Sequence, residues 1–152
     1  MGDQKRNVVF CKFVLKQFSR AESFLVVADG KGELARLLAN KGKKVRVVEN
    51  KPRFRGRGHK RIKYQRGWFS SDAKIEEDVI IGMHPDEATA PIIKAAKKNK
   101  KSWAVVPCCI KGEESQGVGT YSGWLKRLCS LDKGICQTQL RMNGKNIVLF
   151  RR

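Results

Sequence analysis

The sequence predicts an α/β fold that is built on a parallel sheet, and three observations lead to this prediction. Residues 24–48 contain two short apolar runs separated by a glycine turn and by leucines at helical spacing, which is the pattern of a βαβ unit. Two later apolar runs, residues 78–83 and 103–108, have the length and composition of buried strands. Asn143-Gly144 lies between two alternating segments near the end of the chain, which predicts a terminal hairpin.

The first half of the chain is organised around the βαβ unit. Residues 8–20 carry apolar side chains partly at helical spacing, so we interpret them as a helix beside the first strand, with a strand at 7–14 as the alternative. The unit follows as a strand at 24–27, a helix from about Gly32 and a strand at 45–48. Gly42 comes just after the helix, where a left-handed residue is expected. Residues 61–69 alternate in polarity and are predicted as an exposed third strand.

The second half continues with a buried strand at 78–83, a helix, and a fifth strand at 103–108. Asp86 and Thr89 are the candidate caps of the helix, and Pro91 requires its start to lie close to Thr89. Residues 111–119, KGEESQGVG, are predicted as a flexible loop and a candidate lid. A short helix at 121–131 precedes the hairpin, whose strands are expected at 135–142 and 145–151.

The turn after the first strand has the composition of a nucleoside-binding turn. Gly30 and Gly32 permit positive φ angles and let a ligand approach the backbone closely. The helix that opens at about Gly32 presents unpaired N–H groups to such a ligand. Glu49 ends the second strand about 20 residues later, where a carboxylate accepts hydrogen bonds from a ribose. The short pattern by itself fits an ordinary βα turn equally well.

Three segments together resemble one enzyme superfamily. Residues 26–34, VVADGKGEL, look like the first motif of the class I S-adenosylmethionine-dependent methyltransferases. Residues 82–89, GMHPDEAT, and 105–109, VVPCC, resemble elements that follow the fourth and fifth strands in one subgroup of that superfamily. The resemblance runs from about residue 23 to the C-terminus. Val26 and Ala28 depart from it, since they replace the acid and the first glycine of the usual motif.

The resemblance implies a Rossmann-like fold: a mostly parallel sheet with helices on both faces and a C-terminal antiparallel hairpin. Residues 1–152 would then form a single methyltransferase-like domain, with 1–20 as an N-terminal extension and 50–61 as a basic loop. The implied cofactor is S-adenosylmethionine. The residues expected to bind it are Ala28, Asp29, Gly30, Gly32, Glu49, Asn50, Met83 and His84.

Four residues are candidates for chemistry: His84, Asp86, Cys108 and Cys109. If the fourth and fifth strands are neighbours, His84 approaches a cysteine at the edge where an acceptor enters. Such a pair can form a nucleophile, bind a metal or shape the pocket, and we favour the last. His84 or Asp86 could act as the base, although capping a helix is the more ordinary role of Asp86. The residues are too few to predict a metal site.

The charge predicts a polyanionic partner. Thirty-three Lys and Arg residues against fourteen Asp and Glu residues give a net charge of +19. Within residues 41–66 the only acid is Glu49. The residues expected to bind RNA are Lys51, Arg53, Phe54, Arg55, Arg57, Lys60 and Arg61, with Phe54 as a base-stacking ring. The lysines between 94 and 101 are more typical of a solvated face.

The favoured function is therefore methylation of RNA, ribosomal or transfer RNA in particular. The alternative is a non-catalytic RNA-binding or ribosome-associated protein that keeps the methyltransferase fold, and a protein methyltransferase ranks lower. The five cysteines form no C-x-x-C pair and suggest free thiols in a reducing intracellular compartment, the cytoplasm or nucleus, with the mitochondrion as an alternative. No apolar run is long enough for a membrane helix, so no membrane association is expected.

Overall fold

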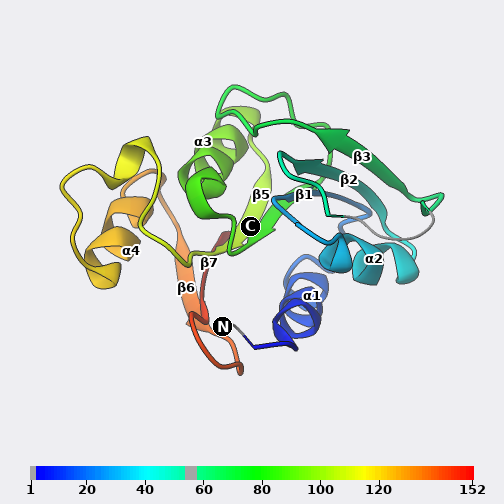
Figure 1. Ribbon diagram of the computed structural model, residues 1–152, viewed down its shortest axis with the longest axis horizontal. Helices are drawn as coiled ribbons and strands as arrows, with labels where there is room; N and C mark the ends of the chain where they lie inside the picture. The colour runs from blue at the N-terminus through cyan, green and yellow to red at the C-terminus, as the bar shows by residue number, and fades with distance from the viewer. Residues whose placement is uncertain (1–2, 54–57) are drawn as a thin grey trace.

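The protein is built on one seven-stranded sheet (Figure 1). The computed structural model describes residues 3–53 and 58–152. The strand order is β3-β2-β1-β4-β5-β7-β6, in which β1 to β5 run parallel and β7 and β6 are antiparallel to their neighbours. The strands are β1 (Ser23–Val27), β2 (Lys44–Glu49), β3 (Ile62–Arg66), β4 (Val79–Met83), β5 (Ser102–Val106), β6 (Cys136–Gln139) and β7 (Ile147–Arg151). This topology confirms the predicted fold class.

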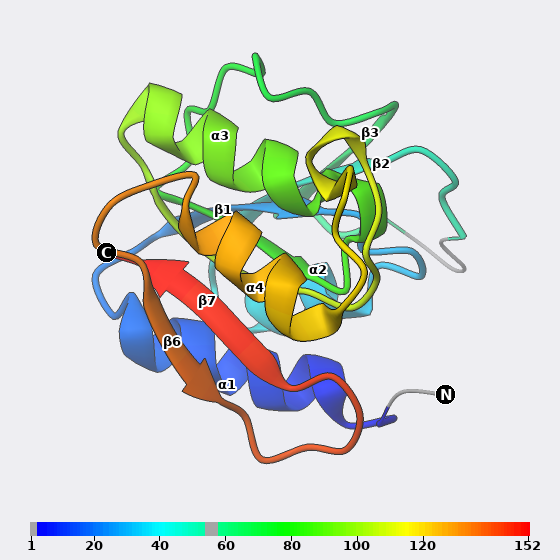
Figure 2. The ribbon, with the colours of Figure 1, turned by 90° about the vertical axis from the view of Figure 1, so that its left-hand side faces the viewer.

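Helices cover both faces of the sheet. The helices are α1 (Arg6–Gln17), α2 (Glu33–Asn40), α3 (Thr89–Asn99) and α4 (Tyr121–Cys129), with short 3₁₀ turns at Asp86–Ala88 and Glu113–Ser115. Figures 1 and 2 show α1 and α2 on one face and α3 and α4 on the other. Alternate residues of each strand supply the two cores: Val26 of β1 faces α1 and α2, whereas Leu25 faces α3 and α4.

The N-terminal segment is a helix, and the alternative of a strand at 7–14 is wrong. Phe10 and Val14 lie one turn apart on its buried face. Phe13 stacks edge-on against Phe150 of β7, with ring centroids 5.2 Å apart. Figure 2 shows α1 lying alongside the terminal hairpin. The first residues of the chain are thus packed against its last strand.

The helix after the glycine turn begins and ends as predicted. Gly32 is its N-cap with φ +78°, and Gly42 follows its end with φ +84°, so both glycines occupy the left-handed region. Leu34 and Leu38 are fully buried against the sheet. The turn therefore delivers the chain from the carboxyl end of β1 directly into α2.

The predicted caps of α3 are wrong. Ala88 occupies the N-cap position, and no side chain caps the helix. The hydroxyl of Thr89 instead donates to the backbone carbonyl of Asp86 at 2.8 Å. Pro91 is the third residue of α3, where its missing N–H costs no intrahelical hydrogen bond.

The terminal hairpin has a longer connection than Asn143-Gly144 predicts. Gln139 pairs with Ile147, so residues 140–146 link β6 to β7. Leu140 and Met142 leave the strand register and bury their side chains in the core beside α1. The N–H of Leu140 still donates to the carbonyl of Asn146 at 2.8 Å, so the hairpin is closed by a connection longer than a two-residue turn at Asn143-Gly144.

The segment at 111–119 is fastened to the helices beside it. Glu114 pairs with Lys94 of α3, and the guanidinium of Arg127 in α4 donates to the carbonyls of Glu114 and Gln116. These contacts argue against the predicted lid.

All five cysteines, which lie in the described part of the chain, are free thiols. None of the helices that the structure describes is both long enough and apolar enough to cross a membrane.

Candidate functional site

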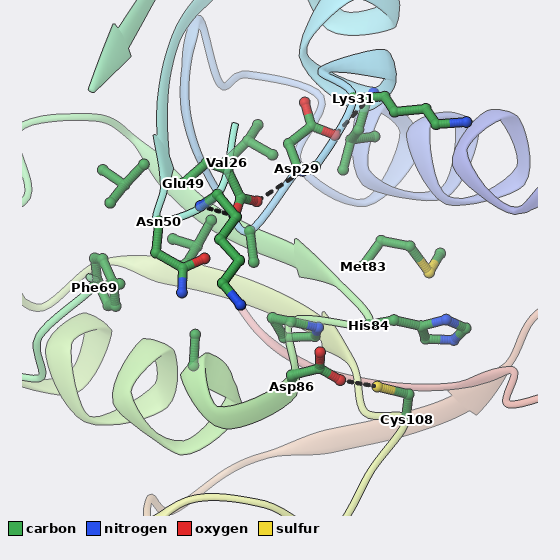
Figure 3. Close-up of a pocket in the computed structure, with 18 of the residues that line it drawn as sticks. Val26, Asp29, Lys31, Glu49, Asn50, Phe69, Met83, His84, Asp86 and Cys108 are labelled. Atoms are coloured by element: carbon green, nitrogen blue, oxygen red, sulfur yellow. Dashed lines mark hydrogen bonds between the residues drawn. The ribbon is translucent and has the colours of Figure 1, made fainter. Parts of the chain in front are cut away.

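A cleft of about 1210 Å³ opens at the carboxyl ends of β1, β2, β4 and β5 (Figure 3). Parallel α/β sheets place their ligand sites at this edge because the loops that leave the strands diverge there. Every residue predicted to bind the cofactor lines the cleft except Gly32, which serves as the N-cap of α2. The four candidates for chemistry, His84, Asp86, Cys108 and Cys109, line it as well.

Glu49 joins the glycine turn to the end of β2. One carboxylate oxygen accepts the N–H of Gly30 at 2.8 Å and the other accepts the N–H of Lys51 at 3.0 Å. The residue is 6% exposed, so these bonds keep a charged group at the floor of the cleft (Figure 3). A carboxylate has lone pairs beyond those two bonds and can still accept from a ligand hydroxyl.

Asp29 occupies the N-terminus of α2. Its carboxylate accepts the N–H groups of Leu34 and Ala35 at 3.1 and 2.9 Å. The expectation that this helix end is free to meet a ligand is therefore wrong for these two donors. Burial raises the pKa of Asp29 to about 7, against the lowering effect of the two N–H bonds, and the charge of Glu49 adds to the rise.

Left-handed backbone at non-glycine residues marks two corners of the cleft. Ala28 has φ +61° at the end of β1, and His84 and Asp86 have φ +50° and +51° after β4. This conformation costs an L-residue about 1–2 kcal/mol. Such strain persists only where surrounding contacts enforce it, and it gathers at ligand sites. Ala28 stands where the methyltransferase motif has glycine, and it adopts the glycine-like conformation nevertheless.

β4 and β5 are neighbours as expected, and the hydrogen-bond partners of the His84 ring are not cysteines. Its Nε2 lies 2.9 Å from the carbonyl of Lys145, and its Nδ1 lies 3.2 Å from the guanidinium of Arg6. A carbonyl only accepts and a guanidinium only donates, so Nε2 carries the proton and Nδ1 accepts. Burial lowers the pKa of His84, and the charge of Arg6 lowers it further. Figure 3 shows the ring turned away from Asp86 and Cys108.

The residue after β4 that contacts a cysteine is Asp86 and not His84. The thiol of Cys108 donates to its carboxylate at 3.1 Å (Figure 3). Burial raises the pKa of Cys108 to about 12, and the hydrogen bond to Asp86 contributes to the rise. Cys108 is therefore a neutral thiol at neutral pH, which disfavours the nucleophile hypothesis. One ligand atom each from Asp86, Cys108 and Cys109 lies within 4.8 Å of the others.

The predicted RNA-binding residues fall into two groups. Lys51 and Arg53 line the cleft, and the N–H of Arg53 donates to the carbonyl of Gly30 at 3.0 Å. Lys60 and Arg61 precede β3 at the opposite edge of the sheet, where Arg61 donates to the carbonyl of Gly42. The length of β3 separates the two pairs by about 15 Å. The remaining predicted residues, Phe54, Arg55 and Arg57, lie outside the described residues.

The cleft also contains residues that the motifs did not single out. Arg6 from α1 lies against His84, and Lys111 lies 3.9 Å from the carboxylate of Asp86. Trp68 is 70% exposed and follows β3 at the rim. The sequence could have identified Trp68 as a candidate site residue, because it directly follows a glycine at the end of an exposed strand. Arg6 gives no such signal, because only the packing of α1 brings it to the site.

The fold is that of the class I S-adenosylmethionine-dependent methyltransferases. Human N-acetylserotonin methyltransferase in complex with S-adenosylmethionine superposes with a TM-score of 0.63 and 15% identity, over 97% of this chain and 51% of that one. Magnesium protoporphyrin IX methyltransferase from Synechocystis PCC 6803, also with bound S-adenosylmethionine, gives a TM-score of 0.68 and 13% identity over 98% and 79%. A glycopeptide N-methyltransferase gives 0.62 and 12% over 95% and 94%.

These similarities establish the fold, and sequence comparison adds nothing to them. No protein-family model matches the chain, and no curated protein matches it. The chain spans 51–66% of the length of the first four of the similar structures. The GMHPDEAT and VVPCC segments that suggested a particular subgroup therefore stand on the sequence alone.

Proposed function

We propose that this protein is an S-adenosylmethionine-dependent methyltransferase that acts on RNA. The observation that carries the first part is the pairing of Gly30 with the buried carboxylate of Glu49 at the cleft floor. Two of the similar structures described above have S-adenosylmethionine bound in this fold. The GMHPDEAT and VVPCC resemblance, which includes both Asp86 and Cys108, supports the same assignment.

The residues at this end of the cleft fit the cofactor. A ribose presents two hydroxyl donors, and Glu49 offers a carboxylate with spare acceptor capacity. A Cβ on Gly30 would approach Arg53 Nη2 to 3.1 Å, so the glycine lets the guanidinium of Arg53 lie close to the turn. The positive charge of Arg53 suits the carboxylate of the cofactor's amino-acid part. When bound, the cofactor supplies an already activated methyl group.

The protein's own contribution is then alignment and exclusion of water. The acceptor enters from the β4–β5 end, where Asp86 is the carboxylate best placed to take a proton from it. His84 has its basic nitrogen turned to Arg6, so we assign it to holding α1 and the hairpin loop at the site.

The RNA part of the proposal rests on charge. The net charge of +19 favours a polyanion, and Lys51 and Arg53 bring positive charge to the cleft itself. Trp68 offers an exposed ring at the rim on which a base can stack. The similar structures are named for small acceptors and a glycopeptide, so they lend the RNA acceptor no support. We expect the partner to be RNA or a ribonucleoprotein in a reducing intracellular compartment.

A second candidate is a non-catalytic RNA-binding or ribosome-associated protein on the same fold. The observation that favours it is the N-terminus of α2, where Asp29 already accepts two of the N–H groups that a ligand would meet. Val26 and Ala28, which replace the acid and the first glycine of the methyltransferase motif, favour the same alternative.

Charge-matched double variants test the RNA proposal. We expect Lys51→Gln with Arg53→Gln to weaken binding of a single-stranded RNA, and to lower the slope of log K against log salt by up to about 1.4. Lys60 and Arg61 do not line the cleft, so we withdraw them as RNA contacts, and Lys60→Gln with Arg61→Gln, which removes the same charge, should leave the slope unchanged. Equal losses of RNA affinity in the two double variants would mean that RNA binding depends on the net charge of the protein and not on the charges at the cleft. Transfer of labelled methyl groups into RNA then separates the two candidates, because the non-catalytic protein binds RNA without labelling it.

A further inference from the structure

Asp86, Cys108 and Cys109 form a cluster whose two thiols have no role in the proposed methyl transfer. The two cysteines follow β5 and Asp86 follows β4, so adjacent parallel strands bring the three side chains to one wall of the cleft. A thiol in a site of this kind has no evident part in aligning an acceptor. The left-handed conformation of Asp86 (φ +51°) turns its carboxylate to meet Cys108.

The spacing of the three ligand atoms suits a tetrahedral metal ion. Zn²⁺ binds thiolate sulfur at about 2.3 Å and carboxylate oxygen at about 2.0–2.2 Å, which places neighbouring ligand atoms about 3.5–3.8 Å apart. Cys108 Sγ lies 3.1 Å from Asp86 Oδ1, and all three ligand atoms lie within 4.8 Å of one another. Small rotations of the exposed Cys109 side chain and of Asp86 therefore suffice to close the site.

The surroundings leave a fourth position open. The three residues line the cleft and none of them is fully buried, so a fourth ligand can reach the ion from the cleft. Three protein ligands with an open fourth position is the arrangement of catalytic zinc sites. Lys111 is the neighbouring opposing charge, 3.9 Å from the other carboxylate oxygen of Asp86, and its side chain is exposed.

We infer that Asp86, Cys108 and Cys109 bind a thiophilic divalent cation, with Zn²⁺ as the best match, at the acceptor end of the cleft. Each thiol that binds the ion releases its proton to solvent, and no oxidation or reduction takes place. Asp86 would then serve as a ligand, and the charge of the ion would lower the pKa of an acceptor atom bound at the fourth position, so that this atom releases its proton to solvent and not to Asp86. This site is independent of whether the protein binds S-adenosylmethionine.

Titration with Co²⁺ as a probe tests the site in the whole chain under reducing conditions. Binding at one ion per chain should produce thiolate-to-cobalt charge-transfer absorption and intense visible bands of tetrahedral Co²⁺, and Zn²⁺ should displace both. Cys109→Ser should lower the affinity for Zn²⁺ by at least about tenfold, the loss that even outer-shell partners of a metal cause. Asp86→Asn and Cys108→Ser should do the same.

Two variants make the test specific. Cys136→Ser removes an exposed thiol of β6, away from the cleft, and should leave metal binding unchanged. Lys111→Gln removes the positive charge beside Asp86 and should tighten Zn²⁺ binding several-fold. The inference is wrong if Co²⁺ gives no thiolate band. It is equally wrong if Cys109→Ser, whose exposed side chain is not needed for folding, binds Zn²⁺ as tightly as the unchanged protein.

Discussion

The two ends of the cleft are held together by different kinds of contact. At the β1–β2 end, the hydrogen bonds that Asp29 and Glu49 accept from the described residues all come from backbone N–H groups. At the β4–β5 end two contacts are between side chains, since a thiol donates to Asp86 and a guanidinium donates to His84, whose ring also donates to the backbone carbonyl of Lys145. The first end is thus fixed by the course of the chain, whereas the second is a set of titratable groups.

This difference separates a scaffold from a reactive surface. Backbone donors cannot be replaced by mutation, so the β1–β2 end tolerates little change in its two carboxylates. At the β4–β5 end the Asp86–Cys108 and His84–Arg6 contacts are between side chains, which a proton, a metal or an acceptor can displace. We therefore expect variants at the first end to alter stability and cofactor affinity, and variants at the second to alter chemistry.

Glu49→Gln should give the largest effect on stability. An amide has one acceptor oxygen, so one of the N–H groups of Gly30 and Lys51 would face another donor. Leaving such a buried donor unpaired costs about 1–3 kcal/mol, and more where the lost acceptor is charged. We expect a loss of about 2–3 kcal/mol in the free energy of unfolding, measured with urea. Glu87→Gln, which changes an exposed residue of the same cleft, is the control. An equal loss of stability in both variants would mean that the hydrogen bonds of Glu49 do not stabilise the fold.

Asp29 should have the second-largest effect on stability, and this effect should depend on pH. Its pKa is about 7 in the folded protein and 3.8 without the fold, so between these values the folded state holds the additional proton. The contribution of Asp29 to stability is therefore complete below about pH 4 and is lost as the pH rises to about 7. A difference of one in pKa corresponds to about 1.4 kcal/mol of stability. Because contact with cleft water screens the carboxyl group, we expect the contribution of Asp29 to the free energy of unfolding to be about 2 kcal/mol.

Measurement of unfolding at several pH values, with the unchanged protein against Asp29→Asn, isolates this contribution. The difference in stability between the two should fall as the pH rises from about 4 to about 7. Glu113→Gln removes one exposed carboxyl from the 111–119 segment and should show no such trend. A difference that stays constant, or that grows with pH, would contradict a raised pKa for Asp29.

Ala28→Gly should give the smallest effect, and in the opposite direction. Glycine removes the left-handed cost of about 1–2 kcal/mol but adds about 0.5–1 kcal/mol of chain entropy to the unfolded state. The net gain is about 0.5 kcal/mol in the free energy of unfolding. Ala35→Gly, within α2, should instead destabilise by about 1 kcal/mol or more. Destabilisation by both substitutions would mean that the conformation of Ala28 is not strained.

The same division explains how much the sequence could predict. The β1–β2 end follows from local pattern: Gly30, Gly32 and the acid at the end of β2 have fixed spacings, and the strands and α2 lie within a few residues of their predicted bounds. The β4–β5 end depends on side-chain direction. His84 and Asp86 both have positive φ, a backbone conformation that the local pattern does not specify, and it is Asp86 that contacts Cys108.

Contacts distant in sequence were beyond prediction for a similar reason. Arg6 reaches His84 across 78 residues, because α1 packs against β4 and the terminal hairpin. The hairpin itself was predicted with the wrong turn, and Leu140 and Met142, which were expected in a strand, are buried in the core on the face that α1 covers. At both places, packing between segments distant in sequence decides the structure, and local sequence preference does not.

The most direct test of the cofactor site is titration with S-adenosylmethionine by calorimetry. The account predicts binding in the micromolar range, and loss of that binding in Gly30→Arg, whose side chain fills the space beneath Arg53 while the protein remains folded by circular dichroism. Absence of binding to the unchanged, folded protein would contradict the proposed methyltransferase. The basic surface and its RNA partner would then be the function that the fold supports.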